Sequence, residues 1–202
     1  MWLEILRESG GSVRTDDGPV LSRLPTAAEL DAVERKLKVR LPASYRSFCQ
    51  ELGPGELGVD DHTVQITAPC RGNKVADLMR TVKDGRKYLR FAIEQSRGTA
   101  RGEGVPEILA DVQPDRTVSF ARDHSGASFF WRTDEPTTNG EYAIYALADE
   151  VPPRILRVAD SFEAFFRTAA RGPQGLVDIG LYGSTSTAGP QVRGFWPVPG
   201  SG

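Results

Sequence analysis

The segment of residues 24–55 constrains the fold most, because its punctuation predicts two consecutive helices. Thr26 and Glu29 have the spacing of a capping box, in which the hydroxyl and the carboxylate each accept a hydrogen bond from a backbone amide at the start of a helix. Apolar residues then recur on one helical face, at Leu30, Val33 and Leu37.

The second helix is predicted to begin at Pro42, since proline is favoured at the first helical position. Gly53 and Pro54 end it, because glycine accepts the left-handed backbone of a helix end and proline cannot continue a helix. Between these ends the apolar residues follow an i, i+3, i+4, i+7 pattern: Tyr45, Phe48, Cys49 and Leu52.

The pattern of the following hundred or so residues is mostly typical of strands, with one helix expected near residues 75–88. A last helix is predicted from Asp160, its expected N-cap, to Gly172. We therefore expect an α+β fold, with a mainly antiparallel or mixed sheet of about six strands flanked by the N-terminal helix pair and the C-terminal helix. The runs typical of strands are residues 64–66, 118–121, 128–132, 141–146 and 155–158.

The length of 202 residues suits one domain with an extension at each end. We place the domain at residues 24–172, between extensions at 1–23 and 173–202. Lys and Arg number 25 against 27 Asp and Glu, so the net charge of -2 favours neither a strongly basic nucleic-acid binder nor an acidic disordered chain. Two cysteines are too few for a disulfide-stabilised scaffold.

The C-terminal extension becomes rich in Gly and Pro from residue 183 and then contains a single charged residue, Arg193. Such a composition cannot form a core of its own. Phe195 and Trp196 leave two alternatives open: a disordered tail, or a pair of apolar groups that docks on the domain or on a neighbouring subunit.

The first residues do not have the pattern of a secretory signal, because Glu4, Arg7 and Glu8 interrupt the apolar run. The longest uncharged apolar stretch elsewhere falls far short of the roughly 20 residues that span a bilayer. We expect a cytoplasmic protein with no membrane partner.

Two histidines, His62 and His124, and two cysteines, Cys49 and Cys70, are the candidates for catalysis or metal binding. His124 stands between Asp123 and a serine, but a catalytic triad is assembled from separated segments, so a polar turn is the interpretation we favour. The spacings match no zinc motif. The sequence thus predicts no catalytic residue, no metal and no cofactor, and hence a non-enzymatic protein.

Residues 83–101 carry an excess of basic residues and also contain Tyr88 and Phe91. A helix face covered with solvated Arg and Lys is the favoured interpretation, and a nucleic-acid patch is the alternative. The basic residues are Lys83, Arg86, Lys87, Arg90, Arg97 and Arg101, against the acidic Asp84 and Glu94.

Acidic pairs recur in predicted loops. If several lie on one face, their carboxylates would imitate phosphates toward a basic protein partner and accelerate association. The candidate partner-binding residues are Asp60, Asp61, Asp134, Glu135, Asp149 and Glu150.

The segment of residues 24–58 resembles the N-terminal signature of the SUKH superfamily, which includes bacterial toxin-immunity proteins and fungal cell-wall-synthesis regulators of the Smi/Knr type. The signature falls on Pro25, Glu29, Leu37, Leu41, Pro42, Tyr45, Phe48, Gly53 and Gly55. A strand and turn that end at Gly126, and a closing helix with Phe162 and Phe165, are similar to the family as well. The long basic segment 83–103 departs from its compact pattern.

The resemblance implies a single α+β domain that binds another protein, and a structural role for its motif residues. An immunity protein for a polymorphic toxin domain, frequently a nuclease, is the leading hypothesis. A regulatory or scaffold module of the cell-wall-regulator type is the first alternative. Nucleic-acid binding through residues 83–101 is the second.

Overall fold

A computed structural model describes residues 1–13, 24–59, 62–70, 77–99, 111–137, 139–148, 153–178 and 193–198. Its strands are β1 (Ser12–Val13), β2 (Gly55–Val59), β3 (His62–Ile66), β4 (Thr117–Asp123), β5 (Ser128–Pro136), β6 (Tyr142–Ala148), β7 (Arg154–Ala159) and β8 (Arg193–Pro197). Its helices are α1 (Trp2–Glu8), α2 (Ala27–Leu37), α3 (Ala43–Glu51), α4 (Leu78–Thr99), α6 (Phe162–Ala169) and α7 (Pro173–Asp178), with a 3-10 turn, η1 (Pro114–Arg116).

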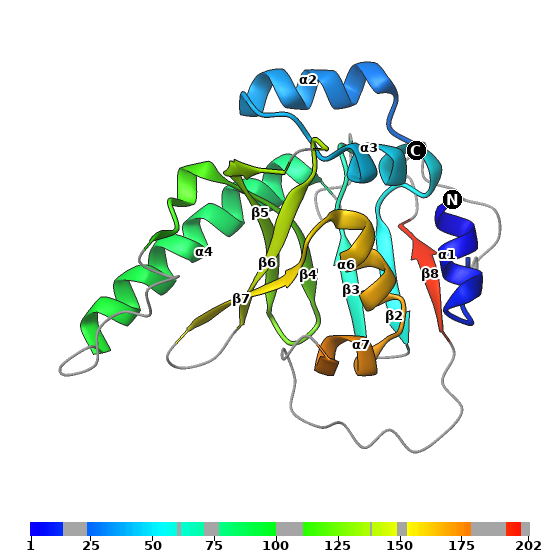
Figure 1. The fold of residues 1–202 in the computed structure, drawn as a ribbon. Coiled ribbons are helices and arrows are strands. Elements are labelled where there is room, and N and C mark those ends of the chain that lie inside the picture. Colours follow the sequence, from blue (N-terminus) through cyan, green and yellow to red (C-terminus); the bar gives the residue numbers. More distant parts are fainter. Residues whose placement is uncertain are drawn as a thin grey trace.

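The strands form one mixed sheet in the order β1-β8-β2-β3-β4-β5-β6-β7, with helices packed on both sides (Figure 1). All neighbouring strands are antiparallel except β1 and β8, which are parallel. The α+β class is confirmed. Among the described residues the sheet has eight strands rather than about six, because the short strands β1 and β8 join it.

The predicted helix pair is confirmed as α2 and α3. The capping box is present at the start of α2: the Thr26 hydroxyl accepts from the Glu29 amide at 3.3 Å, and the Glu29 carboxylate accepts from the Thr26 amide at 2.9 Å. Leu30 and Val33 are buried on its inner face. The helix ends at Lys38, which takes a left-handed backbone with φ of 58°.

The second helix begins at Ala43, one residue later than predicted. Pro42 has an extended backbone and no side-chain acceptor, so it cannot cap the helix itself. A carboxylate distant in the sequence caps the helix instead: Glu141 accepts from the Ser44 amide at 2.7 Å and from the Ser44 hydroxyl at 2.6 Å. Gly53 ends the helix region with φ of 74°, as predicted.

The main core lies between α1, α3 and α6 and one face of the sheet (Figure 1). Aromatic rings meet there edge to face, with centroids 5.0 Å apart for Trp2 and Phe166 and 5.2 Å apart for Tyr45 and Trp131. Phe162 lies among them, 5.1 Å from the Tyr45 ring. Buried rings of this kind dominate core energetics, so this core holds α1, α3 and α6 against the sheet.

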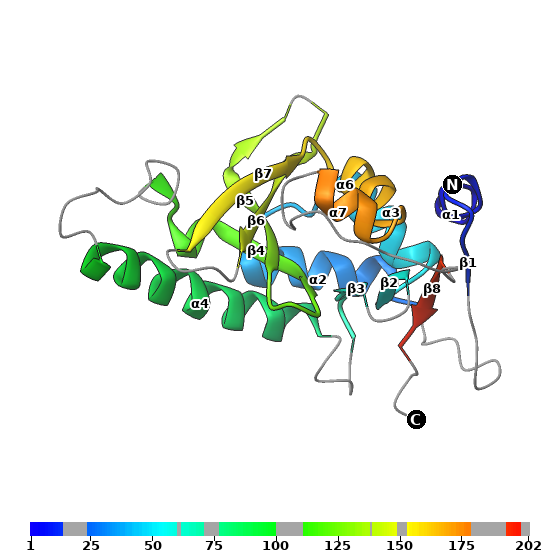
Figure 2. The same ribbon diagram turned by 90° about the horizontal axis from the view of Figure 1, so that it is seen from below.

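The helix expected near residues 75–88 is longer and runs from Leu78 to Thr99 as α4. It packs on the opposite side of the sheet from α6 (Figure 2), where Leu89 and Ala92 join a second apolar cluster with Phe130 and other strand residues. Gly85 lets the helix approach closely, because a Cβ there would collide with the Ser119 side chain.

The closing helix α6 is capped by Ser161 rather than by Asp160. The Ser161 hydroxyl accepts from the Ala164 amide at 3.1 Å, whereas Asp160 forms an ion pair with Arg157 at 2.8 Å. The helix begins one residue later than expected, so the cap moves with it.

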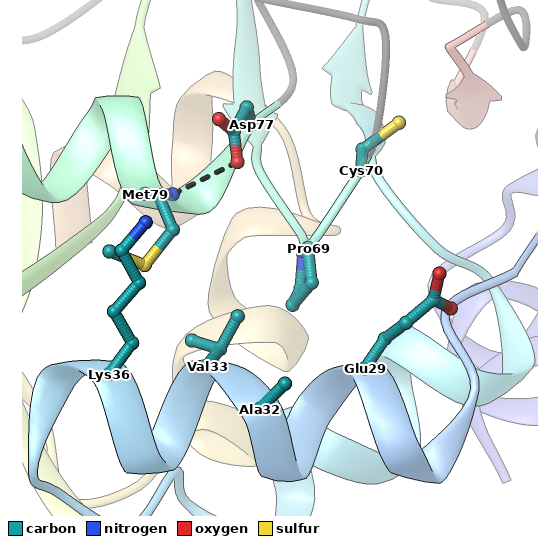
Figure 3. A pocket seen from close by; sticks show the side chains of 8 residues that line it. All are labelled: Glu29, Ala32, Val33, Lys36, Pro69, Cys70, Asp77 and Met79. Atoms are coloured by element: carbon teal, nitrogen blue, oxygen red, sulfur yellow. Dashed lines mark hydrogen bonds between the residues drawn. The ribbon is translucent and has the colours of Figure 1, made fainter.

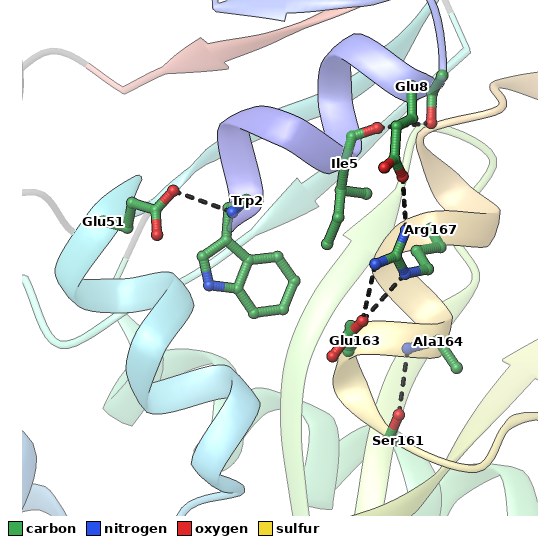
Figure 4. Close-up of polar contacts among 9 residues, drawn as sticks. Trp2, Ile5, Glu8, Glu51, Ser161, Glu163, Ala164 and Arg167 are labelled. Atoms are coloured by element: carbon green, nitrogen blue, oxygen red, sulfur yellow. Dashed lines mark hydrogen bonds and ion pairs between the residues drawn. The ribbon is translucent and has the colours of Figure 1, made fainter.

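Residues from both predicted extensions contribute to the same sheet and core. Phe195 is fully buried and β8 lies between β1 and β2, so the alternative in which this part of the tail docks on the domain is the correct one. In α1, the Trp2 amide donates to Glu51 at 2.9 Å, and Glu8 pairs with Arg167 of α6 at 2.9 Å (Figure 4). The division of the chain at residues 24 and 172 stays a prediction.

Candidate protein-interaction surface

The residues of the SUKH-like signature build the scaffold. Leu41, Tyr45 and Phe48 have exposed fractions of 3%, 0% and 0%, and Phe162 and Phe165 are equally enclosed, at 0% and 1%. Five further residues of the family motifs also have structural positions. Pro25, Pro42 and Gly53 are buried, Glu29 caps α2, and Gly126 forms a turn with φ of 101°.

One predicted acidic pair, Asp134 and Glu135, lies in the last residues of β5 rather than in the loop that we expected, around the guanidinium of Arg132. Arg132 lies 3.3 Å from an Asp134 oxygen and 3.0 Å from a Glu135 oxygen, and the Tyr145 hydroxyl donates to Glu135 at 2.7 Å. We call these four residues the Arg132 cluster. Glu135 keeps 42% of its side chain exposed, so it is the carboxylate that a partner can reach most easily.

The electrostatics of the Arg132 cluster favour its charged form. Burial disfavours the Arg132 charge, but the hydrogen bond with Asp134 and the two neighbouring carboxylates outweigh it and raise the pKa of Arg132. Burial and the hydrogen bond to Glu135 raise the pKa of Tyr145, so its hydroxyl keeps its proton and remains a donor. The cluster is thus a fixed group of charges near the C-terminal end of β5.

The other two acidic pairs are flanked by strand ends on the side of the sheet opposite to Asp134, where β4 finishes and β5 begins. The strand register places the end of β2, the start of β3, the ends of β4 and β6 and the start of β7 on that same side of the sheet. Asp60, Asp61, Asp149 and Glu150 themselves lie outside the described residues. Their role in partner binding stays a prediction.

The turn between β4 and β5 lies on this same side of the sheet, and it confirms the predicted polar turn. The Asp123 carboxylate accepts from the Ala127 amide at 2.7 Å and from the Ser125 hydroxyl at 3.0 Å, and only 4% of Asp123 is exposed. Asp123 therefore shapes the turn, and His124 and Ser125 are exposed beside it. A hollow of about 160 Å³ adjoins the turn and is lined by polar groups: Glu56, Thr63, Gln65, Arg122, Asp123 and His124.

The predicted basic segment belongs to α4, and the structure divides its residues. Arg86 is half-buried and donates to the Thr117 carbonyl at 3.0 Å, and burial lowers its pKa. Arg90 pairs with Asp115. Lys83 and Lys87 are exposed, while the side chain of Arg97 and the whole of Arg101 lie outside the described residues. The solvated helix face that we favoured fits the described part better than a continuous nucleic-acid patch.

A second hollow, of about 400 Å³, lies between α2 and the segment that leads into α4 (Figure 3). Its lining combines apolar residues, Ala32, Val33, Pro69 and Met79, with the polar or charged Glu29, Lys36, Cys70 and Asp77. The Asp77 carboxylate accepts from the Met79 amide at 3.1 Å and so stabilises the start of α4. Within the described part of the chain, no three His, Cys, Asp or Glu side chains are grouped to hold a metal ion.

Sequence reasoning misses two residues that organise these surfaces. Arg132 lies two positions before Asp134 on a strand, which puts both side chains on one face, so this contact had a local signal. Glu141 reaches Ser44 across 97 positions of sequence, and no local pattern indicates such a cap.

Comparison with known families identifies a match over most of the chain. A model described as the SMI1 / KNR4 family (SUKH-1) matches residues 24–168, which include the helix pair, α4, β2 to β7 and nearly all of α6. No protein with a curated description matches the chain. In the described part, no helix has the length and apolar character needed to cross a membrane.

Proposed function

The chain belongs to the SMI1 / KNR4 family (SUKH-1), and from this premise we propose that it is a non-enzymatic immunity protein that binds and neutralises a cognate bacterial toxin domain. Family membership supports a general role as a protein-interaction module. The immunity role, the stoichiometric block of the toxin without a cofactor, and a cytoplasmic site of action are our extension of it. A nuclease is the toxin class that we expect.

The observation that carries the proposal is the burial of the family signature. Tyr45, Phe48 and Phe162 lie in the core with no exposed surface, so the matched motif specifies the fold and leaves the surface free to differ between relatives. A scaffold with a variable surface is what a set of specific binders needs, although fold alone does not establish function.

The Arg132 cluster is the described surface that we assign to the toxin. A nuclease must attract phosphate, so its active site presents basic groups. Glu135 is held by Arg132 and Tyr145 and would enter such a site without losing much conformational freedom, which favours tight binding. Asp134 is largely enclosed by the same contacts and positions the cluster.

Co-expression with the toxin domain encoded beside this gene tests the proposal. We expect survival of the cells and a stoichiometric complex on size-exclusion chromatography. Glu135→Lys should weaken the complex by about 10–100-fold, because it sets a positive charge against a basic site. Glu4→Lys makes the same change of charge at an exposed position of α1 and should have little effect. Equal killing with and without this protein, and no complex, would refute the immunity role.

A regulatory or scaffold module is the alternative within the same family. The neighbouring gene separates the two: a large exported protein with a variable C-terminal domain favours immunity. Retention on a nucleic-acid column at low salt, lost in an Arg86, Lys87 and Arg90 neutralised variant, would favour the nucleic-acid alternative. The internal contacts of Arg86 and Arg90 weigh against that outcome.

A further inference from the structure

The outer face of α4 carries an exposed aromatic ring between two opposite charges. Phe91 is 53% exposed, although the inner side of the same helix packs on the sheet. Lys87 precedes it by about one turn and Glu94 follows it by slightly less than one turn, and both are exposed. We call these three residues the Phe91 face.

The charges of the Phe91 face have no partner among the described residues, unlike their neighbours on α4. Arg80 pairs with Asp84 at 3.5 Å, and Arg90 pairs with Asp115. Lys87 and Glu94 make no hydrogen bond or ion pair within the described part of the chain. The helix thus presents one positive and one negative group on either side of an apolar ring.

We propose that a second copy of this chain covers the Phe91 face, with the two α4 helices antiparallel about a two-fold axis beside Phe91. Along a helix, Lys87 lies about 6 Å before Phe91 and Glu94 about 4.5 Å after it. A two-fold axis reverses the helix direction, so Lys87 of each copy meets Glu94 of the other. The two Phe91 rings come together at the centre, and the interface closes after two copies.

The presence of both charge signs selects this occupant. A nucleic acid would be attracted by Lys87 but repelled by Glu94, whereas an identical face turned through the two-fold satisfies both. Two-fold interfaces are self-complementary in this way, because the same patch is used by both subunits.

The expected dimer is weak. With 22 residues, α4 is about 33 Å long, and one helix pair buries less than the roughly 1,600 Å² of a standard stable interface. We therefore expect a dimer dissociation constant in the micromolar to millimolar range, so the fraction of dimer should rise with protein concentration.

Sedimentation velocity of the full chain, at concentrations up to about 1 mM, tests the pairing. Lys87→Glu and Glu94→Lys should each raise the dimer dissociation constant by at least about 10-fold, because each creates two contacts between like charges. The double variant should return it to within about threefold of the wild type, since the ion pairs form again with exchanged signs. Lys83→Glu, one turn away, makes the same change of charge as Lys87→Glu and should alter it by less than about threefold.

A wild-type chain that stays monomeric throughout, or a double variant that associates no better than the single ones, would overturn the proposal. Binding of a single-stranded oligonucleotide that Lys87→Glu abolishes and the double variant does not restore would assign the face to nucleic acid instead. The inference goes beyond the immunity role, because toxin binding by a Lys87→Glu monomer would leave that role intact.

Discussion

Cys49 is fully buried on the inner face of α3, one turn from Tyr45. Burial is the largest influence on both groups: it raises the pKa of the Cys49 thiol to about 12 and the pKa of the Tyr45 hydroxyl well above its usual value. The Tyr45 hydroxyl donates to the Thr67 carbonyl at 2.6 Å and so keeps its proton in the fold. Both groups are neutral in the folded chain across the range in which proteins are normally handled.

We expect these two groups to make the chain sensitive to alkali. Below about pH 9 the thiol is neutral in both the folded and the unfolded chain, so it does not change the free energy of unfolding with pH. Between about pH 9 and 12 the unfolded chain releases the proton that the folded chain keeps, so the free energy of unfolding falls as the pH rises. The loss from Cys49 alone approaches about 1.4 kcal/mol per pH unit. Urea unfolding across this range measures it, and Cys49→Ala should give a shallower slope. The same slope in both proteins would contradict the assignment.

Single residues also mark where sequence reasoning stops. The apolar face with Tyr45 and Phe48 was predictable, because burial imposes a period on the sequence. The cap of α6 was not, since Asp160 and Ser161 are adjacent and both types cap well. The choice depends on the residue at which the chain turns into the helix, and that is set by packing of Phe162 in the core.

At the scale of elements, α3 depends on a cap from another part of the chain. Glu141 supplies acceptors for both the amide and the hydroxyl of Ser44. Glu141→Ala leaves these donors unpaired and removes a negative charge from the helix N-terminus, so we expect a loss of about 1–3 kcal/mol in the free energy of unfolding. Urea unfolding measures the loss. Glu4→Ala, at an exposed position, should cost less than about 0.5 kcal/mol; equal effects would refute the long-range cap.

The close contact of α4 with β4 depends on the glycine at position 85, which has no side chain. In an exposed helix Gly→Ala is stabilising by about 1 kcal/mol, but at Gly85 the new methyl group would collide with Ser119. We expect Gly85→Ala to destabilise the protein by about 1–3 kcal/mol. Combined with Ser119→Gly, the loss should be smaller than the sum of the two single losses. An additive pair in thermal or urea unfolding would show that the helix does not approach the strand at this point.

Two elements show why their extent was hard to predict. The apolar period of α4 continues through Leu89, Ala92 and Ile93, but basic residues are interspersed with them, so the helical pattern is hard to follow beyond residue 88. In β2, Gly55 and Gly58 give a poor strand propensity, and the strand forms because β3 and β8 pair with it on both sides. Tertiary pairing therefore overrides local preference in β2, whereas in α4 the helical period was present but hard to follow.

For the whole molecule, Gly55 controls whether the two ends of the chain meet in the sheet. A Cβ at this position would collide with the Phe195 ring and lie 2.6 Å from the Trp196 carbonyl oxygen. We expect Gly55→Val to displace β8 and, with it, to free β1, whose described partner in the sheet is β8. Hydrogen exchange should show faster exchange of the β1 and β8 amides, while β5 and β6 stay protected.

Phe195→Ala provides the matched comparison for that experiment. It removes the buried ring without the collision and should cost about 3–5 kcal/mol. Both variants should therefore loosen the same two strands. Unchanged exchange in β1 after Gly55→Val would mean that the N-terminal strand does not depend on β8.

The class of fold and most of the central elements could be predicted from residues 24–172, because their signals are local. The place of β8 could not, since its short apolar pair gives no indication of which strand it joins. The candidate surface was partly predictable for a similar reason: Asp134 and Glu135 were found as an acidic pair and the contact with Arg132 had a local signal, but Tyr145 reaches Glu135 from the neighbouring strand β6.

The position of β8 has a consequence for how the protein is made. Ser12 pairs with Gly194, so the first strand to be synthesised has to wait for a strand that leaves the ribosome far later. Until then the outer edge of β2 is unpaired and Phe48 lacks its neighbour Phe195, so the nascent chain exposes both a strand edge and apolar surface. Chaperone binding to the nascent chain should therefore persist until residues 193–197 have left the ribosome and paired with β2.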